Sequence, residues 1–191
     1  MSDRFAKFYQ PEDKLDFHTL MNDWSAECIT LQNPATRRIT SISGDGDQVE
    51  TSSESLEVTV SSRVPVIFQL WLSGDTDITC GIRFIGDGRV VEEYGLDGLC
   101  QDEIDRVLRV IVARFKMKAV EVPSLFLVSD REGYTIVMNW DRLSVTGRYE
   151  EQVCPDVLGI PLERLVDFEK CSDYRAVRFG EYLIVARNAM A

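Results

Sequence analysis

The sequence predicts an α+β protein built on a mostly antiparallel sheet of six or more strands, with one or two amphipathic helices packed on it. Three observations lead to this prediction. Short apolar segments of strand length, such as "PVIFQLWL" and "ITCGIRFI", recur between turn signals in the middle of the chain. Asp87-Gly88 separates two such segments, and Asp-Gly favours a tight hairpin because both turn positions need positive φ. The segment at 101–117 has instead the period of a helix.

The first predicted helix spans residues 11–24. Pro11 suits the first helical position, and two acidic residues follow it in the first turn. Apolar residues then recur at the spacing of one helix face, at Phe17, Leu20, Met21 and Trp24. This face is expected to pack on the sheet.

Strands are predicted for most of the chain between the two helices. In 55–62, apolar Leu56, Val58 and Val60 alternate with polar residues, which is typical of a half-buried strand. Gly/Asp clusters follow several of these strands and are interpreted as turns, because none has the ligand spacing of a calcium loop. The predicted strands lie at 27–33, 37–42, 55–62, 65–72, 78–85 and 89–94.

The helix at 101–117 has the clearest pattern in the chain. Acidic residues open it and basic residues close it, as the helix dipole favours. Its apolar residues form one continuous stripe, which predicts that it packs across one face of the sheet. The stripe consists of Ile104, Val107, Leu108, Ile111, Val112 and Phe115.

The C-terminal third is less regular. A hairpin is predicted at 124–140 with its turn at 130–133, and a further strand at 142–149. A short helix is expected to start near Pro161, and one or two final strands to occupy 176–187.

No internal repeat is visible, and the whole chain, 1–191, is predicted to be a single α+β domain. A weaker alternative places a boundary near 119–122. Residues 43–55 are rich in acids and serines and contain no Lys or Arg, so they are predicted to form a mobile acidic loop within the domain.

Composition narrows the possible classes of function. The net charge is −11, and the first hundred residues hold 17 acids against 8 Lys and Arg, a balance of −9. Such a chain repels phosphate backbones, so nucleic-acid binding is disfavoured and a basic protein partner is favoured.

No apolar run reaches the ~18 residues of a membrane helix. The N-terminal segment lacks the apolar region of a secretory signal, and the 5 cysteines form no CxxC pair. We therefore expect a cytoplasmic protein with reduced, mostly buried thiols.

Catalytic signatures are weak. His18 is the one histidine, so a metal site with two histidines from one chain is excluded. Cys100 directly precedes a predicted helix, where the helix dipole could favour a thiolate. Glu92 and Glu93 are adjacent on a predicted strand and must point to opposite faces. An inward Glu could be an acid of raised pKa or a polar anchor in a ligand pocket, although a position reaching solvent near the strand end is favoured. No catalytic residue, cofactor or metal is predicted.

These features predict a non-enzymatic acidic protein that binds a basic partner in a toxin-neutralising, chaperone-like or adaptor role. Two alternatives stay open: a small-molecule binder with a cavity between sheet and helix, and an enzyme that uses carboxylates in such a cavity. The residues predicted to contact the partner are Asp45, Asp47, Glu50, Glu54 and Glu57.

Overall fold

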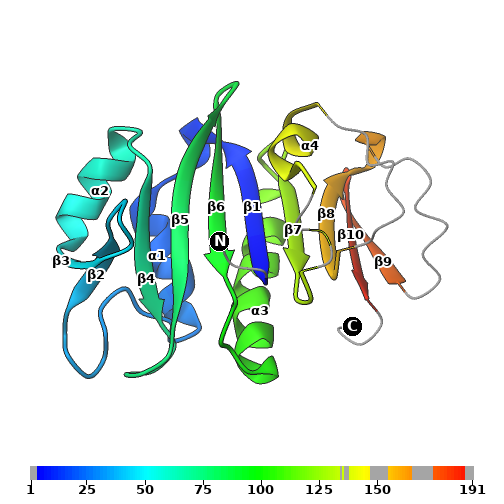
Figure 1. Ribbon diagram of the computed structural model, residues 1–191. Coiled ribbons are helices and arrows are strands. Elements are labelled where there is room, and N and C mark those ends of the chain that lie inside the picture. The colour runs from blue at the N-terminus through cyan, green and yellow to red at the C-terminus, as the bar shows by residue number, and fades with distance from the viewer. Residues whose placement is uncertain (1–3, 134, 136–137, 147–154, 165–173, 188–191) are drawn as a thin grey trace.

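A computed structural model describes most of the chain, and its central feature is one sheet of ten strands. All pairings are antiparallel, and the strand order is β3-β2-β4-β5-β6-β1-β7-β8-β10-β9. Figure 1 shows α1 and α3 behind this sheet and α4 in front of it. The predicted α+β class is therefore confirmed. The described residues are 4–133, 135, 138–146, 155–164 and 174–187.

The elements have the following bounds. The strands are β1 (Phe5–Pro11), β2 (Ile39–Ile42), β3 (Gln48–Thr51), β4 (Val66–Trp71), β5 (Asp77–Gly86), β6 (Arg89–Gly95), β7 (Phe126–Asp130), β8 (Val157–Pro161), β9 (Tyr174–Phe179) and β10 (Tyr182–Arg187). The helices are α1 (Phe17–Ala26), α2 (Ser53–Ser61), α3 (Gln101–Lys118) and α4 (Trp140–Thr146), with 3₁₀ turns η1 (Glu12–Lys14) and η2 (Leu162–Arg164).

Helices cover the two faces of the sheet unequally. The larger apolar core lies between one face and the helices α1, α2 and α3, and it includes Phe8 of β1 and Phe115 of α3. The smaller core lies on the opposite face, where Trp140 of α4 packs with Tyr9 and Phe126. Strand β1 therefore contributes buried side chains to both faces.

The sequence prediction missed β1. This strand pairs with β6 on one side and β7 on the other, so it lies near the middle of the sheet. Because both of its faces are buried, it lacks the polar–apolar alternation that identifies a half-buried strand. Its one charged residue, Lys7, is held by an ion pair with Glu93 at 2.9 Å.

The helix predicted at 11–24 begins later than expected. Residues 12–14 form only a 3₁₀ turn, and α1 starts at Phe17. The cap explains the boundary, because the Asp16 carboxylate accepts a hydrogen bond from the Thr19 N–H at 2.7 Å. The apolar face is as predicted, with Trp24 fully buried.

The stretch 55–62, predicted as a strand, belongs mostly to helix α2. The Ser52 hydroxyl caps this helix by accepting a hydrogen bond from the Ser55 N–H at 3.1 Å. Leu56 and Val60, four residues apart, are buried, whereas Val58 between them is 65% exposed. Leu and Val at alternate positions over so few residues fit a strand and a helix face alike, and the cap favours the helix.

The other central strands lie where they were predicted, except in 27–33, where Thr30 makes only an isolated bridge with Trp71. Strands β2, β4, β5 and β6 fall within or overlap the predicted stretches, and α3 extends one residue beyond the predicted helix. The hairpin turn is confirmed, because Asp87 has φ 50° and Gly88 has φ 67°.

The hairpin predicted at 124–140 is wrong. Strand β7 pairs with β1 and β8, and the chain enters α4 at Trp140. The turn after β7 is held by Asp130, whose carboxylate accepts hydrogen bonds from the N–H groups of Glu132 and Gly133. An Asx-type turn uses the same residue types as a hairpin turn, so the sequence alone does not distinguish the two.

Further differences follow downstream. Of the strand predicted at 142–149, residues 142–146 are helical, and 147–149 lie outside the described residues. Pro161 ends strand β8, residues 162–164 form the 3₁₀ turn η2, and the rest of the stretch in which a helix was predicted lies outside the described residues. The two final strands, β9 and β10, confirm the prediction for 176–187.

Candidate functional site: an acidic surface beside an open sheet edge

The five acidic residues predicted to bind a partner lie at the β3 end of the sheet. All five are exposed to solvent. We call them the acidic surface. Two lie in the turn between β2 and β3, one in β3 and two in α2: Asp45 and Asp47, Glu50, and Glu54 and Glu57.

The backbone of this region differs from the loop predicted at 43–55. Residues 48–51 form strand β3, which pairs with β2, and residues 53–55 begin α2. Even the turn at 43–47 is closed by a hydrogen bond from the Ser43 N–H to the Asp47 carbonyl at 2.9 Å. Three of the five acids are therefore carried by regular secondary structure and two by the turn between β2 and β3, so residues 43–55 are not one loop as expected.

Basic residues compensate little of this negative charge. Among the described residues, one ion pair involves the acidic surface, between Arg38 and Glu50 at 3.4 Å, and both side chains are about two-thirds exposed. An exposed ion pair of this kind contributes little to stability. Hydrogen bonds from its own N–H and from Ser52 keep the pKa of Glu54 below its usual value, so this carboxylate is ionised at neutral pH.

The acidic surface borders an open edge of the sheet. Strand β3 ends the strand order and pairs with β2 alone within the described part of the chain. The other side of its backbone therefore offers free N–H and C=O groups. Apolar side chains are also exposed in this region, among them Val49 of β3 at 47% and Val58 of α2 at 65%.

A small cavity lies beside the acidic surface, between the start of α1, the end of α2 and β5. It has a volume of about 230 Å³. Glu57 lines it together with Glu12 and Asp16, and the Asp16 pKa is lowered by its hydrogen bonds to Thr19. Arg63 pairs with Glu12 at 2.9 Å. Arg63 itself lines the cavity, and the other lining residues are Leu15, Phe17, Val60, Ser61 and Phe84.

Two of these cavity acids were not predicted from the sequence. Glu12 was assigned to the first turn of the predicted helix, where acids are expected for electrostatic reasons, and Asp16 fell within that helix without being singled out. They lie about 40 residues or more from Glu57 along the chain, so only the packing of α1 against α2 brings the three carboxylates together.

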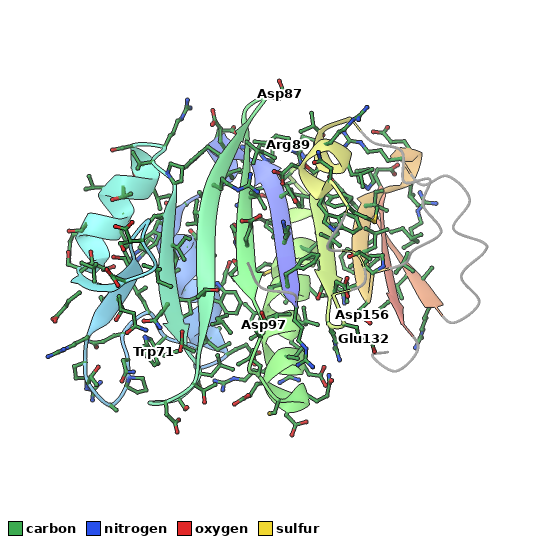
Figure 2. The ribbon with its side chains drawn as sticks, in the orientation of Figure 1. Trp71, Asp87, Arg89, Asp97, Glu132 and Asp156 are labelled. Carbon is green, nitrogen blue, oxygen red and sulfur yellow. The ribbon has the colours of Figure 1, made fainter. Side chains whose placement is uncertain are left out.

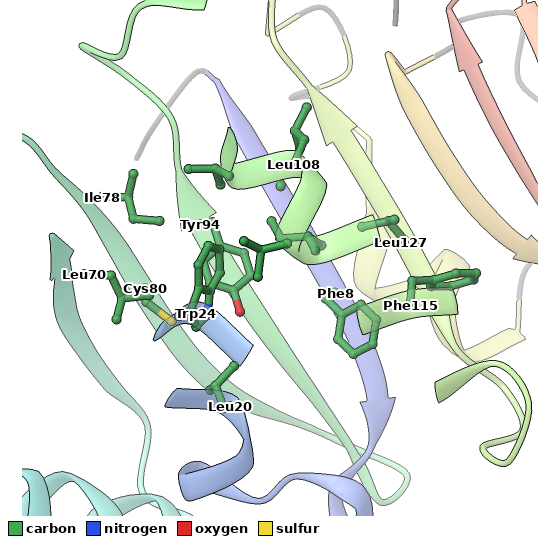
Figure 3. Packing of buried hydrophobic residues seen from close by; sticks show 14 of the residues in the cluster. Phe8, Leu20, Trp24, Leu70, Ile78, Cys80, Tyr94, Leu108, Phe115 and Leu127 are labelled. Atoms are coloured by element: carbon green, nitrogen blue, oxygen red, sulfur yellow. The ribbon is translucent and has the colours of Figure 1, made fainter. Parts of the chain in front are cut away.

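A second set of polar side chains is buried under α3. Glu92 is 0% exposed and points to the helix-covered face, so the favoured position near solvent is wrong. Its carboxylate receives hydrogen bonds from Arg114, at 3.0 Å to Oε1, from Gln10 at 2.7 Å and from the Tyr94 hydroxyl. Figure 3 shows Tyr94 beside Trp24 in this core.

This buried set is a structural ion pair. Burial alone would raise the pKa of Glu92, but the guanidinium of Arg114 and the hydrogen bond from Tyr94 hold it below its usual value. Arg114 also binds Asp23 of α1 at 2.9 Å, which ties α1 and α3 to the sheet. Glu92 is thus an ionised carboxylate bound by side chains of the chain itself, and the raised-pKa hypothesis is wrong.

The remaining candidates show no catalytic arrangement. His18 is exposed on α1, and Glu93 pairs with Lys7 on the opposite sheet face from Glu92. Within the described residues, no group of His, Cys, Asp and Glu side chains is placed to hold a metal ion.

The cysteines differ in part from the prediction. Cys80 is buried and free, whereas Cys28 and Cys100 are free but exposed. The expectation of mostly buried thiols is therefore wrong for two of these three. Cys154 and Cys171 lie outside the described residues.

Comparisons with known proteins give no further guide. No family model matches the chain, and neither a curated protein nor a solved structure shows significant similarity to it. Among the described residues, no helix is long and apolar enough to cross a membrane.

Proposed function

We propose that the protein binds a basic segment of another protein at the acidic surface. The observation that carries this proposal is the cavity lined by Glu57, Glu12 and Asp16, which adjoins exposed acids and whose lining also includes apolar residues and one basic residue, Arg63. A Lys or Arg side chain has an apolar stem and a cationic tip, and so matches both parts of this lining.

The size of the cavity favours a side chain over a free ligand. Pockets for drug-sized molecules have volumes of roughly 300–1,000 Å³, whereas this cavity has about 230 Å³. The open edge of β3 provides backbone groups with which an extended partner segment can pair. Exposed Val49 on the same strand would contact apolar residues of that segment.

Electrostatics sets the expected kinetics. The negative field of the acidic surface reaches about 8 Å at physiological salt, so a basic partner is attracted before contact. The acids should therefore raise the association rate more than they slow dissociation. The net charge of −11 disfavours nucleic acid as the partner. The free thiols of Cys28, Cys80 and Cys100 support a cytoplasmic location as part of this proposal.

The test compares two variants with equal changes in charge. The first replaces the acidic surface with Asn and Gln. The second, a matched control, replaces five exposed acids elsewhere: Asp75, Asp87, Asp102, Glu121 and Glu163. A partner retained by the immobilised wild-type chain from extracts of the native host is purified, and its association and dissociation rates are measured at several salt concentrations.

The first variant should associate more slowly than wild type, with a flatter salt dependence and a nearly unchanged melting temperature. The control should keep most of the wild-type rate, because its charges lie outside the acidic surface. Equal association rates for both variants at low ionic strength would refute the proposal and reduce the acids to a solubility role.

A further inference from the structure

Strand β3 has an open side at one end of the sheet. It is last in the strand order and pairs with β2 alone among the described strands. Gln48, Val49 and Glu50 are all exposed, although they alternate between the two faces of the strand. Figure 2 shows this end of the sheet as an outer boundary of the molecule, with side chains projecting outward from it. The residues that the structure does not describe all precede β1 or follow β7 in the chain, and β1 lies five inter-strand spacings, about 24 Å, from β3.

The hydrogen bonds between β2 and β3 determine which backbone groups face the open side. The Ser43 N–H donates to the Asp47 carbonyl at 2.9 Å and closes the hairpin. Hydrogen-bonded and non-hydrogen-bonded pairs alternate along an antiparallel ladder, so the next hydrogen-bonded pair lies two residues farther along β3, at Val49. Gln48 and Glu50 belong to the non-hydrogen-bonded pairs. Their N–H and C=O groups therefore point away from β2, toward the open side.

The two faces of β3 differ in chemistry. Ser41 of β2 lies opposite both Val49 and Phe68, and residues opposite each other in neighbouring strands share a face. Phe68 belongs to the larger core, so Val49 is on the face of the sheet that α2 also covers. Gln48 and Glu50 are on the other face. A chain segment beside β3 would thus contact an exposed apolar side chain on one face and a carboxylate on the other.

Charge determines which kind of segment fits this open side. Among the described residues, Glu50 has one ion pair, the exposed contact with Arg38, and the other four acids of the acidic surface lie just before and just after β3 in the chain. A second copy that paired through the same strand would bring these acids together, and like charges across a strand pair are destabilising. A charged residue on an edge strand is a common protection against such self-pairing. The same charge attracts a basic segment.

We propose that the basic segment of the partner binds as an eleventh strand along β3, with basic and apolar side chains in alternation. This inference rests on the proposed function and specifies the partner's conformation and sequence pattern. The backbone of the segment pairs with the outward N–H and C=O groups of Gln48 and Glu50. Its basic side chains lie on the face of Glu50, and its apolar side chains lie on the face of Val49. Backbone hydrogen bonds provide affinity in this mode of binding, and alternate side chains provide specificity.

The first test measures amide hydrogen exchange by NMR in the full-length chain. The probe is a short peptide of alternating lysine and valine with blocked ends, long enough to span β3. Without it, the amides of Val49 and Thr51 should exchange slowly because they bond to β2, and those of Gln48 and Glu50 should exchange quickly. Saturating peptide should slow exchange at Gln48 and Glu50 about tenfold, as expected when a hydrogen bond forms.

Two results of this measurement would overturn the proposal. One is unchanged exchange at both Gln48 and Glu50 in the presence of saturating peptide. The other is protection of these two amides that appears without peptide as the protein concentration rises, which would assign the open side to a second copy of the chain.

Altered peptides separate strand pairing from attraction by charge alone, and they leave the protein unchanged. A peptide with the same lysines and valines in two blocks keeps the charge but loses the alternation, so it should bind less tightly. Two further peptides carry N-methyl groups on the lysine amides or on the valine amides. Only one of these two sets of amides can face β3, so their affinities should differ about tenfold. Equal affinities for the two methylated peptides would refute strand pairing.

Protein variants distinguish failure of this inference from failure of the proposed function. Gln48→Pro removes an outward N–H without a change in charge, at a position where an edge strand tolerates proline. It should bind the alternating peptide about threefold to tenfold more weakly than its control, Gln48→Ala, which keeps the N–H. The variant with Asn and Gln on the acidic surface tests the charges. Weak binding by that variant, with equal binding by the two Gln48 variants, would refute strand pairing and leave the proposed function standing. Binding by that variant as tight as that of wild type would refute the proposed function itself.

Discussion

Replacing Arg114 with Met should destabilise the protein strongly and reverse the way its stability depends on pH. Arg114 is 1% exposed and binds Glu92, which is 0% exposed, together with Asp23 of α1. Methionine fills much of the volume of the arginine stem but removes the charge. The change therefore leaves the Glu92 carboxylate buried without its guanidinium.

The expected loss is large. Removing one partner of a buried ion pair costs about 3–5 kcal/mol, and a domain is stable by only about 5–15 kcal/mol. Glu92 keeps its hydrogen bonds from Tyr94 and Gln10, so the loss should fall toward the lower end of that range. Adding Glu92→Gln removes the uncompensated charge and should recover roughly 2 kcal/mol or more.

The pH dependence follows from the direction of the Glu92 pKa shift. In wild type this pKa lies below the unfolded value, so its contribution is present above about pH 4.3 and is lost as the pH falls through the folded pKa. Without Arg114, burial should raise the folded pKa above the unfolded one. The folded variant then binds more protons than the unfolded chain, so its stability falls as the pH rises. Lys118 remains nearby, but its amine binds the Gln10 side chain.

Urea unfolding followed by tryptophan fluorescence measures this effect, because Trp24 packs on Tyr94 with ring centroids 5.0 Å apart. Wild type should show nearly constant stability between pH 5 and 8, whereas Arg114→Met should lose stability across that interval. Arg109→Met is the matched control, since it removes an exposed arginine of the same helix. A loss below about 1 kcal/mol, or a variant with the wild-type pH profile, would contradict the assigned role of the ion pair.

Two further predictions concern the hairpin and the thiols. Gly88→Val should lower the free energy of unfolding by roughly 1 kcal/mol or more, because Gly88 has φ 67° and a β-branched residue is strained there. Since no atom lies within 4 Å of the added Cβ, backbone strain is the cause, and an unchanged urea midpoint would argue against it. For the thiols, Cys28 and Cys100 should react quickly with a thiol reagent in the native protein, and Cys80 only after unfolding, because Cys80 is buried. Mass spectrometry of the labelled peptides identifies the sites, and rapid native labelling of Cys80 would contradict its burial.

Elements with a strong local signal were predictable from the sequence. Helix α3 has an unbroken apolar stripe and charges that match the helix dipole. Its helical conformation and the face that it buries against the sheet therefore follow from residues close in sequence. The β5–β6 hairpin is likewise local, since Asp87 and Gly88 adopt the positive φ values that their turn requires. The exposure of the five acids followed from their polarity alone.

Elements that depend on distant partners were not predictable. Strand β1 lies beside β6 and β7, whose residues are about 80 and 120 positions away, and its two buried faces have no local periodicity. The apolar residues of 55–62 fit the period of a strand and also that of a helix. In the helix that forms, Leu56 and Val60 lie on one face and pack on the core. In both cases the deciding energy comes from burial against other elements.

The sequence alone determined the α+β class, the excess of acids at one end of the chain and the main helix, because these depend on composition and on residues close in sequence. Only the tertiary structure decided where charges meet. It turned Glu92 inward to Arg114 and brought Asp16 to Glu57 beside a cavity. Charge–charge energies depend on separation and burial in space, and spacing along the chain specifies neither for residues on different elements.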